Sequence, residues 1–276
     1  MKRCFLIMVS LLLLPLLAAG QSLVIVHTND THSHIEPLRT GSGPEEGMGG
    51  VIERAAFVDS IRRAEGKGKV LLLHAGDFSQ GSSYFTVLKG NLEIDLINAM
   101  GYDAVALGNH EFDNGIEELT RRLKSLKCPV VCANYDFSPF ELGKYVHPYA
   151  IVRRGGLKIG IIGLLTDISR VVSSEIADRI PAFDAVEVTN KYAAVLKNEK
   201  HCDLVIALTH IGFDEGEGIS DLNLVAGTRN VDAVVGGHSH TFLKKAVLEK
   251  NSDGKIVPIV QDGCWGLYEG VLKVNL

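Results

Sequence analysis

The sequence predicts an α/β protein. After residue 22, short apolar runs alternate with longer amphipathic segments, which is the pattern of strands connected by helices. The composition, 46% hydrophobic and 22% charged over 276 residues, is typical of a globular chain rather than a disordered or repetitive one. We see no internal repeat and no linker rich in Pro, Gly or Ser, so residues 21–276 are expected to form one domain.

The first 20 residues have the pattern of a secretory signal peptide. Lys2 and Arg3 precede a leucine-rich run that ends at small residues, Ala18-Ala19-Gly20. The run is shorter than the ~20 residues that a membrane-spanning helix needs. No cysteine follows it, which argues against a lipoprotein anchor. We therefore expect a cleaved signal peptide at residues 1–20, a secreted or periplasmic protein, and no stable membrane anchor.

Strands are predicted where aliphatic and β-branched residues follow one another in short runs. In chain order these runs are Leu23–His27, Val70–His74, Asp103–Leu107, Pro129–Ala133, Leu157–Leu164, Asp203–Thr209, Asp232–Val235, Ile256–Val260 and Leu267–Val274. Helices are predicted where apolar residues recur every three or four positions. These segments are Ile52–Ala64, Leu92–Met100, Gly115–Leu126, Ala185–Lys197 and Ser220–Gly227.

Charge and cysteine content exclude several classes of function. The net charge of −5 and the lack of a Lys/Arg run argue against nucleic-acid polymers as partners, and the low aromatic content gives no indication of a base-stacking surface. Cys128 and Cys132 flank an extended run and would lie about 13 Å apart, too far to pair with each other. We expect these two cysteines, with Cys202 and Cys264, to be buried free thiols, although export would permit disulfides.

Five of the predicted strands are followed directly by Asp, Asn or His. Since ligands of α/β proteins bind beyond the carboxyl ends of the strands, these side chains are expected to form one site. The candidate residues, in chain order, are Asp30, His32, Asp77, Asn109, His210, His238 and His240. Glycines beside them, such as Gly76 and Gly108, would allow sharp turns and a close approach of the backbone.

This set has the chemistry of metal ligands. Imidazole, carboxylate and amide oxygen together suit zinc, manganese or iron. Seven ligands exceed the four of a tetrahedral zinc site, which favours two divalent ions sharing a carboxylate. A pair of ions about 3.5–4 Å apart can hold both the attacking and the leaving oxygen of an in-line displacement at phosphorus. The sequence thus predicts a dinuclear site for phosphate ester chemistry.

The motifs, in this order, resemble the calcineurin-like metallophosphoesterases. They are similar to the 5′-nucleotidase branch, which also holds UDP-sugar hydrolases and 2′,3′-cyclic nucleotide phosphodiesterases. The matching stretches are Asp30-Thr31-His32, Gly76-Asp77, Gly108-Asn109-His110-Glu111, His210, Gly237-His238-Ser239-His240 and Gln261-Asp262-Gly263-Cys264-Trp265-Gly266. The resemblance implies two mixed β-sheets packed face to face with helices outside, a four-layer αββα sandwich.

The resemblance also implies a role for each residue of the site. The first metal would be held by Asp30, His32 and His240; the second by Asn109, His210 and His238; and Asp77 would bridge both. His110 would stabilise the transition state or protonate the leaving oxygen, and Asp113 would orient its imidazole. Glu111 either hydrogen-bonds nearby groups or supplies the acidic charge that is common at a helix start.

The leading hypothesis is an exported dinuclear phosphoesterase that hydrolyses phosphate monoesters, with nucleotides first among them, by in-line attack of a metal-bound hydroxide. In the similar branch a C-terminal domain normally holds the base, and the sequence ends where that domain would begin. We therefore expect either a separately encoded nucleotide-binding partner or loose selectivity. A cyclic-nucleotide or nucleotide-sugar phosphodiesterase is the enzymatic alternative, and a metal-binding scaffold subunit is the non-enzymatic one.

Overall fold

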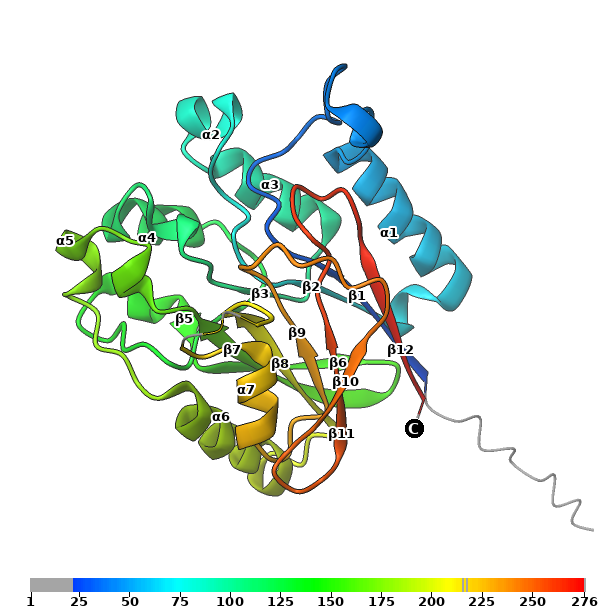
Figure 1. The fold of residues 1–276 in the computed structure, drawn as a ribbon, viewed down its shortest axis with the longest axis vertical. Coiled ribbons are helices and arrows are strands. Elements are labelled where there is room, and N and C mark those ends of the chain that lie inside the picture. The colour runs from blue at the N-terminus through cyan, green and yellow to red at the C-terminus, as the bar shows by residue number, and fades with distance from the viewer. Residues whose placement is uncertain (1–21, 215, 217, 276) are drawn as a thin grey trace, which may run out of the picture.

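Two six-stranded β-sheets form the centre of the fold (Figure 1). The computed structural model describes residues 22–214, 216 and 218–275, so the predicted signal peptide at residues 1–20 lies outside the described residues. The first sheet has the order β12-β1-β2-β3-β4-β5, and only β12 runs antiparallel to its neighbour. Its strands are β1 (Ser22–Thr28), β2 (Val70–His74), β3 (Ala104–Ala106), β4 (Val130–Val131), β5 (Val146–His147) and β12 (Gly270–Asn275).

The second sheet has the order β10-β11-β9-β8-β7-β6. Its four central strands are parallel, and the two outer strands, β10 and β6, pair antiparallel. Its strands are β6 (Tyr149–Arg154), β7 (Leu157–Leu165), β8 (Leu204–His210), β9 (Ala233–Val235), β10 (Val247–Lys250) and β11 (Ile256–Val260). Both sheets are therefore mixed, as the family resemblance implied.

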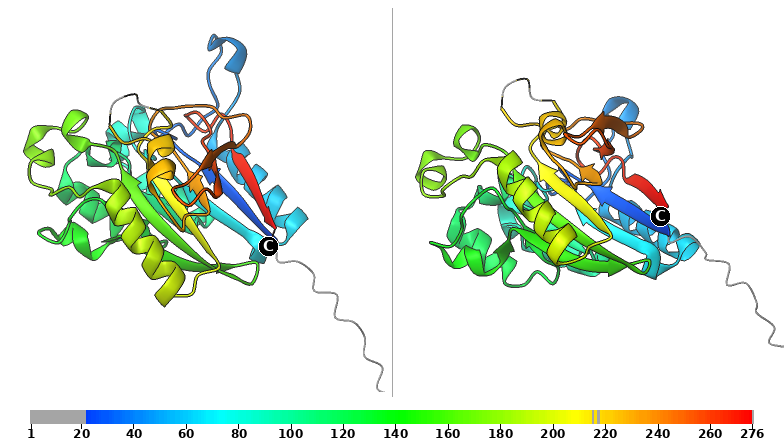
Figure 2. Two further views of the ribbon diagram at one scale, coloured as in Figure 1. Left: turned by 60° about the horizontal axis from the view of Figure 1, so that its bottom comes forward. Right: turned by 90° about the horizontal axis from the view of Figure 1, so that it is seen from below.

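The sheets pack face to face through aliphatic side chains. Ile25 and Leu71 of the first sheet belong to one buried cluster with Ile161 and Ile206 of the second. Because successive strand residues point to opposite faces, the alternate positions of β1 and β2 pack against helices instead. Helices α1, α3 and α4 cover the outer face of the first sheet, and α6 and α7 cover that of the second (Figures 1 and 2). The predicted four-layer sandwich is confirmed.

The helices of the described chain include two short ones that the sequence did not predict, α2 and α5. The bounds are α1 (Val51–Glu65), α2 (Ser83–Leu88), α3 (Asn91–Met100), α4 (Ile116–Leu123), α5 (Ser174–Ala177), α6 (Ala185–Ala194) and α7 (Asp221–Gly227). A π-helical turn, Val195–Glu199, extends α6. Among the described residues no helix has the length and apolar character that crossing a membrane requires.

The strands that the sequence analysis missed share one location. β5, β6 and β10 each lie at the edge of a sheet. Edge strands are half-exposed and carry polar residues, so their sequences lack the continuous apolar run of a central strand. The fourth edge strand, β12, was predicted from Leu267 but begins at Gly270. Helix α4 ends at Leu123, before the predicted Leu126.

The cysteines of the described chain form no disulfide. All four are free thiols, as predicted, but only Cys132 and Cys202 are buried; Cys128 and Cys264 are half-buried, which corrects the prediction. Burial raises the pKa of Cys128 and of Cys132 to about 12, so both thiols stay protonated at neutral pH.

Candidate metal centre

The candidate residues meet where the carboxyl ends of both sheets come together. The loops after β1 and β2 continue the pairing of their strands, because Asp30 N donates to Gly76 O at 3.0 Å and His32 N to Asp77 O at 3.0 Å. The second sheet joins them through His210 at the end of β8, whose Nδ1 donates to Ala75 O at 2.7 Å. One site is therefore assembled from loops of both sheets.

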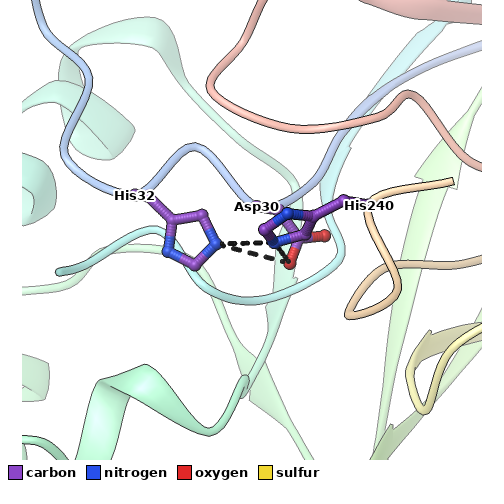
Figure 3. Close-up of side chains that lie close together, drawn as sticks. All are labelled: Asp30, His32 and His240. Atoms are coloured by element: carbon purple, nitrogen blue, oxygen red, sulfur yellow. Dashed lines mark hydrogen bonds and ion pairs between the residues drawn. The ribbon is translucent and has the colours of Figure 1, made fainter. Parts of the chain in front are cut away.

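Three overlapping groups of side chains at this point have the spacing of metal ligands. Within each group the potential ligand atoms lie within 4.8 Å of one another. The groups are Asp30, His32 and His240; His32, Asp77 and His110; and Asp77, His210 and His238. Figure 3 shows the first group, in which the rings of His32 and His240 meet beside the Asp30 carboxylate. Their Nε2 atoms are 3.0 Å apart.

Hydrogen bonds orient the Asp30 carboxylate. Its Oδ2 accepts from Asn29 Nδ2 at 2.7 Å and from His238 N at 2.9 Å. Its Oδ1 has no hydrogen-bond partner and lies 3.3 Å from His240 Nε2 and 3.7 Å from His32 Nε2. One oxygen is therefore fixed by the protein, and the other faces two imidazoles.

The Asp77 carboxylate lies between the two sides of the site. Its Oδ1 accepts from His110 N at 2.9 Å. Its Oδ2 is 3.1 Å from His210 Nε2 and 3.9 Å from His32 Nε2, so a single oxygen faces ligands of both outer groups. A carboxylate in this position is suited to bridging two cations.

Two buried oxygen atoms test whether a cation fits. Asp30 Oδ1 and Asn109 Oδ1, the latter just beyond β3, are buried and accept no hydrogen bond. Buried polar atoms without partners are rare because leaving them unpaired costs free energy. A divalent cation coordinated by these oxygens would remove that cost, so the donor set fits metal ions.

The pKa values of the site show strong coupling between carboxylates and imidazoles. Burial acts to raise the pKa of Asp30 and of Asp77, but the neighbouring histidines, His210 first among them, together outweigh it and lower both below the usual range. Burial acts to lower the pKa of His210, yet Asp77 and Asp30 raise it to about 10. The pKa of His240 is also raised to about 10, first by the Asp30 carboxylate 3.3 Å away and then by Cys264. Metal binding must therefore displace the protons of the His210 and His240 imidazoles.

His238 behaves in the opposite way. Burial and the neighbouring His210 lower the pKa of His238 to about 4. Its ring lies 5.1 Å from that of His210, in an edge-on contact. A neutral imidazole is the form that binds a metal, so His238 needs no proton displaced from it at neutral pH.

The backbone of the site is unusual. Five of the seven candidate ligands are non-glycine residues in the left-handed region: Asp30 (φ 49°), His32 (44°), Asp77 (53°), His238 (82°) and His240 (54°). The neighbouring glycines leave no room for a side chain. A Cβ at Gly108, for example, would overlap Asp77 Oδ1 and Asp77 N. The shape of the site thus depends on backbone as well as on side chains.

His110 and Asp113 lie at the open side of the site. His110 Nδ1 donates to Asp113 Oδ2 at 3.0 Å, and the two side chains are 30% and 33% exposed. This hydrogen bond raises the pKa of His110, with a further contribution from Asp77, against the opposing effect of burial. The His110 ring also contacts the His32 ring edge-on at 5.3 Å. An imidazole whose protonated form is favoured by Asp113 is thus held beside the ligand groups and is accessible to solvent.

Two supporting residues become clear only from the structure. Glu111 is fully buried, and its carboxylate accepts from Asp77 N, Ser79 N and Gly108 N. Glu111 therefore hydrogen-bonds both the loop after β2 and the loop after β3. This agrees with the interpretation that it hydrogen-bonds nearby groups. Asn29 adjoins Asp30 in the sequence but was not among the predicted site residues; its other partners lie more than 230 residues away.

Comparisons with known proteins show to which family the chain belongs. The family model described as calcineurin-like phosphoesterase matches residues 23–242. A venom 5′-nucleotidase of Naja atra is 37% identical over 92% of this chain and 50% of its own length, and human 5′-nucleotidase is 35% identical over 94% and 47%. The solved 5′-nucleotidase precursor of Thermus thermophilus matches with a TM-score of 0.83 and 37% identity over 92% of this chain and 51% of that one.

The fold and the clustered His and Asp side chains define the class of metallophosphoesterases. The chain belongs to the calcineurin-like phosphoesterase family and is homologous to 5′-nucleotidases. Its family and relatives support a metal-dependent phosphate ester hydrolase, as the sequence predicted. The chain spans about half the length of the curated relatives it matches.

Proposed function

We propose that this chain is an exported dinuclear metal phosphoesterase that hydrolyses phosphate monoesters, with nucleotides as the leading substrates. The observation that carries the proposal is the presence of two ligand groups next to the His110–Asp113 pair. One group is Asp30, His32 and His240, and the other is Asp77, His210 and His238. The relatives named 5′-nucleotidase support nucleotides as the substrate class. The apolar segment before residue 21 supports export with a cleaved signal peptide at residues 1–20.

Each ligand has a proposed place. Asp30, His32 and His240 would hold one ion, while Asn109, His210 and His238 would hold the other, and Asp77 would be shared by both. Two divalent ions, zinc, manganese or iron, would supply an activated water as nucleophile and would neutralise charge on the phosphoryl oxygens. The hydrogen bonds that fix Asp30 Oδ2 and Asp77 Oδ1 leave one oxygen of each carboxylate free for this purpose.

His110 would handle the proton of the leaving group. Its raised pKa favours the protonated form of the imidazole, and Asp113 holds Nδ1 so that the rest of the ring can face the substrate. In the proposed step a bond forms from the water oxygen to phosphorus as the bond from phosphorus to the leaving oxygen breaks, and His110 gives its proton to the leaving oxygen. General acid catalysis of this kind contributes roughly 10²–10⁴-fold to a rate.

The relatives are about twice as long as this chain, so part of their substrate recognition can lie outside the region that matches it. We propose that a separately encoded nucleotide-binding protein supplies part of that recognition, or that selectivity among esters is loose. Addition of such a partner would then raise the activity in a stoichiometric manner.

The testing experiment measures phosphate release by the metal-reconstituted chain with AMP, UDP-glucose, 2′,3′-cyclic AMP and p-nitrophenyl phosphate. We expect release from the two monoesters, and a His110→Ala variant that keeps its metals but loses about 10²–10⁴-fold in kcat. His147→Ala, which changes an exposed histidine of β5, is the matched control and should leave kcat unchanged. Absence of release from every ester with both metals bound would refute the proposal.

A further inference from the structure

Trp265 is the only tryptophan of the sequence, and it is attached to the edge of the metal centre. Its peptide N–H donates to the carbonyl oxygen of Asp30 at 2.6 Å. In Figure 1 the red loop between β11 and β12, which carries Trp265, runs beside the blue segment that follows β1. The backbone of Trp265 is left-handed, with φ at 62°, which is unfavourable for a bulky side chain and common at functional sites.

The indole ring has one partner and a free surface. It stacks on the His34 ring with 4.9 Å between ring centroids and 20° between planes. Nevertheless 38% of the residue remains exposed to solvent. A stacked aromatic ring that is held in one orientation and left open to solvent can pack against another planar ring.

This aromatic pair lies on the side of the centre where the leaving group is expected. His34 follows the candidate ligand His32 by two residues, and the His32 ring contacts that of His110. Since His110 is the proposed donor of the proton to the leaving oxygen, the leaving group would depart past His32. The other ligand group, with His210 and His238, does not contact His34 or Trp265 through any ring.

A groove next to His34 has room for a small molecule. Its volume is about 340 Å³, within the range of ligand-binding pockets. It lies between the segment that follows β1 and the start of α2. Ser33, His34, Glu36, Arg39, Ser82 and Tyr84 are among the residues that line it. The hydroxyl and charged groups of this lining could hydrogen-bond a sugar.

We propose that Trp265, stacked on His34, forms a subsite for a planar aromatic leaving group, such as the base of a nucleotide or an aryl ring. The inference rests on the proposed function, because it requires a leaving group at this site. Stacking on an aromatic side chain depends little on the identity of the base. The subsite therefore selects aromatic esters over aliphatic ones and does not discriminate among bases. The low aromatic content of the sequence gave no indication of such a stacking surface.

The kinetic test compares AMP with ribose 5-phosphate, which has the same sugar and phosphate but no base. Trp265→Ala should lower kcat/KM for AMP roughly 5- to 100-fold, as expected for the loss of one base–aromatic stack, and leave ribose 5-phosphate within about twofold. Trp265→Phe should recover most of the loss. Phe183→Ala removes an aromatic side chain that is 50% exposed elsewhere on the surface, and it should change neither substrate. Equal loss for both substrates would overturn the proposal.

A second readout does not depend on turnover. Because Trp265 is the only tryptophan, the intrinsic fluorescence of the metal-loaded chain reports on this ring alone. Adenosine should change the emission in a saturable way, while ribose should not. If neither AMP nor ribose 5-phosphate is hydrolysed, the proposed function fails, and the adenosine titration still tests the subsite. Emission that is unaffected by adenosine would refute the subsite even in an active enzyme.

Discussion

Asn29 offers the most direct test of how the Asp30 carboxylate is held. The buried Asn29 side chain makes three hydrogen bonds: its Nδ2 donates to Asp30 Oδ2 and to Gly263 O, both at 2.7 Å, and its Oδ1 accepts from Asp262 N at 2.9 Å. It therefore orients a proposed ligand and joins the loop after β1 to the loop after β11. Replacement should weaken the metal site and the fold together.

The expected magnitudes follow from these bonds. Asn29→Ala leaves the buried Asp262 N–H and Gly263 carbonyl unpaired and removes one bond to a charged group, which should cost about 3–5 kcal/mol of unfolding free energy. Loss of such a supporting group typically weakens metal binding roughly 10- to 100-fold. Asn29→Asp is nearly isosteric but should bind the first metal worse than Ala does, because it places an oxygen against Asp30 Oδ2 and Gly263 O.

The assay combines urea denaturation with metal analysis of the folded variants. We expect two ions per chain in the wild type and one in Asn29→Asp, because the side chains of Asp77, Asn109, His210 and His238 make no direct hydrogen bond with Asn29. The matched control is Asn98, whose amide also bonds two backbone groups, Ser125 O and Lys127 N, but at the surface. Metal content and affinity of Asn29→Asp that equal those of the wild type would refute the reasoning.

Three further predictions test the rest of the centre. Asp77→Ala should lose both ions, and one tightly held ion in that variant would disprove the bridging role. Asp113→Ala removes the hydrogen bond that raises the pKa of His110, so the alkaline limb of the kcat profile should move to lower pH with metal content unchanged; an unmoved limb would contradict this. Gly108→Ala should displace Asp77, lose metal and destabilise the fold by at least about 1–3 kcal/mol. Gly68→Ala is the control, because open space surrounds Gly68, and it should have none of these effects. Thermal unfolding and metal analysis measure both variants.

The central part of the fold was predictable from the sequence because its signals are local. Strands such as β1, β2 and β8 are buried on both faces, so their sequences are continuous apolar runs. The polar residues that follow these runs are adjacent to them in the chain. The convergence of candidate residues could therefore be inferred without knowing how the two sheets pack.

The supporting groups were not predictable in this way. The partners of Asn29 in the loop after β11, and the stacking of Trp265 on His34, depend on contacts between distant segments. A carboxylate such as Glu111 looks the same in sequence whether it begins a helix or binds three buried N–H groups. Only the packing of the two sheets against each other decides between these cases.

The left-handed backbone of five candidate ligands sets stability against function. Each such residue costs on the order of 1 kcal/mol or more. Five of them together approach the net stability of a typical domain, about 5–15 kcal/mol. Glycine adopts this conformation freely, so replacing His32 by glycine should make the metal-free protein more stable while it impairs the metal site. Selection for stability alone would therefore replace these ligand residues first. In the metal-loaded protein, the free energy of metal binding offsets the cost of the left-handed backbone.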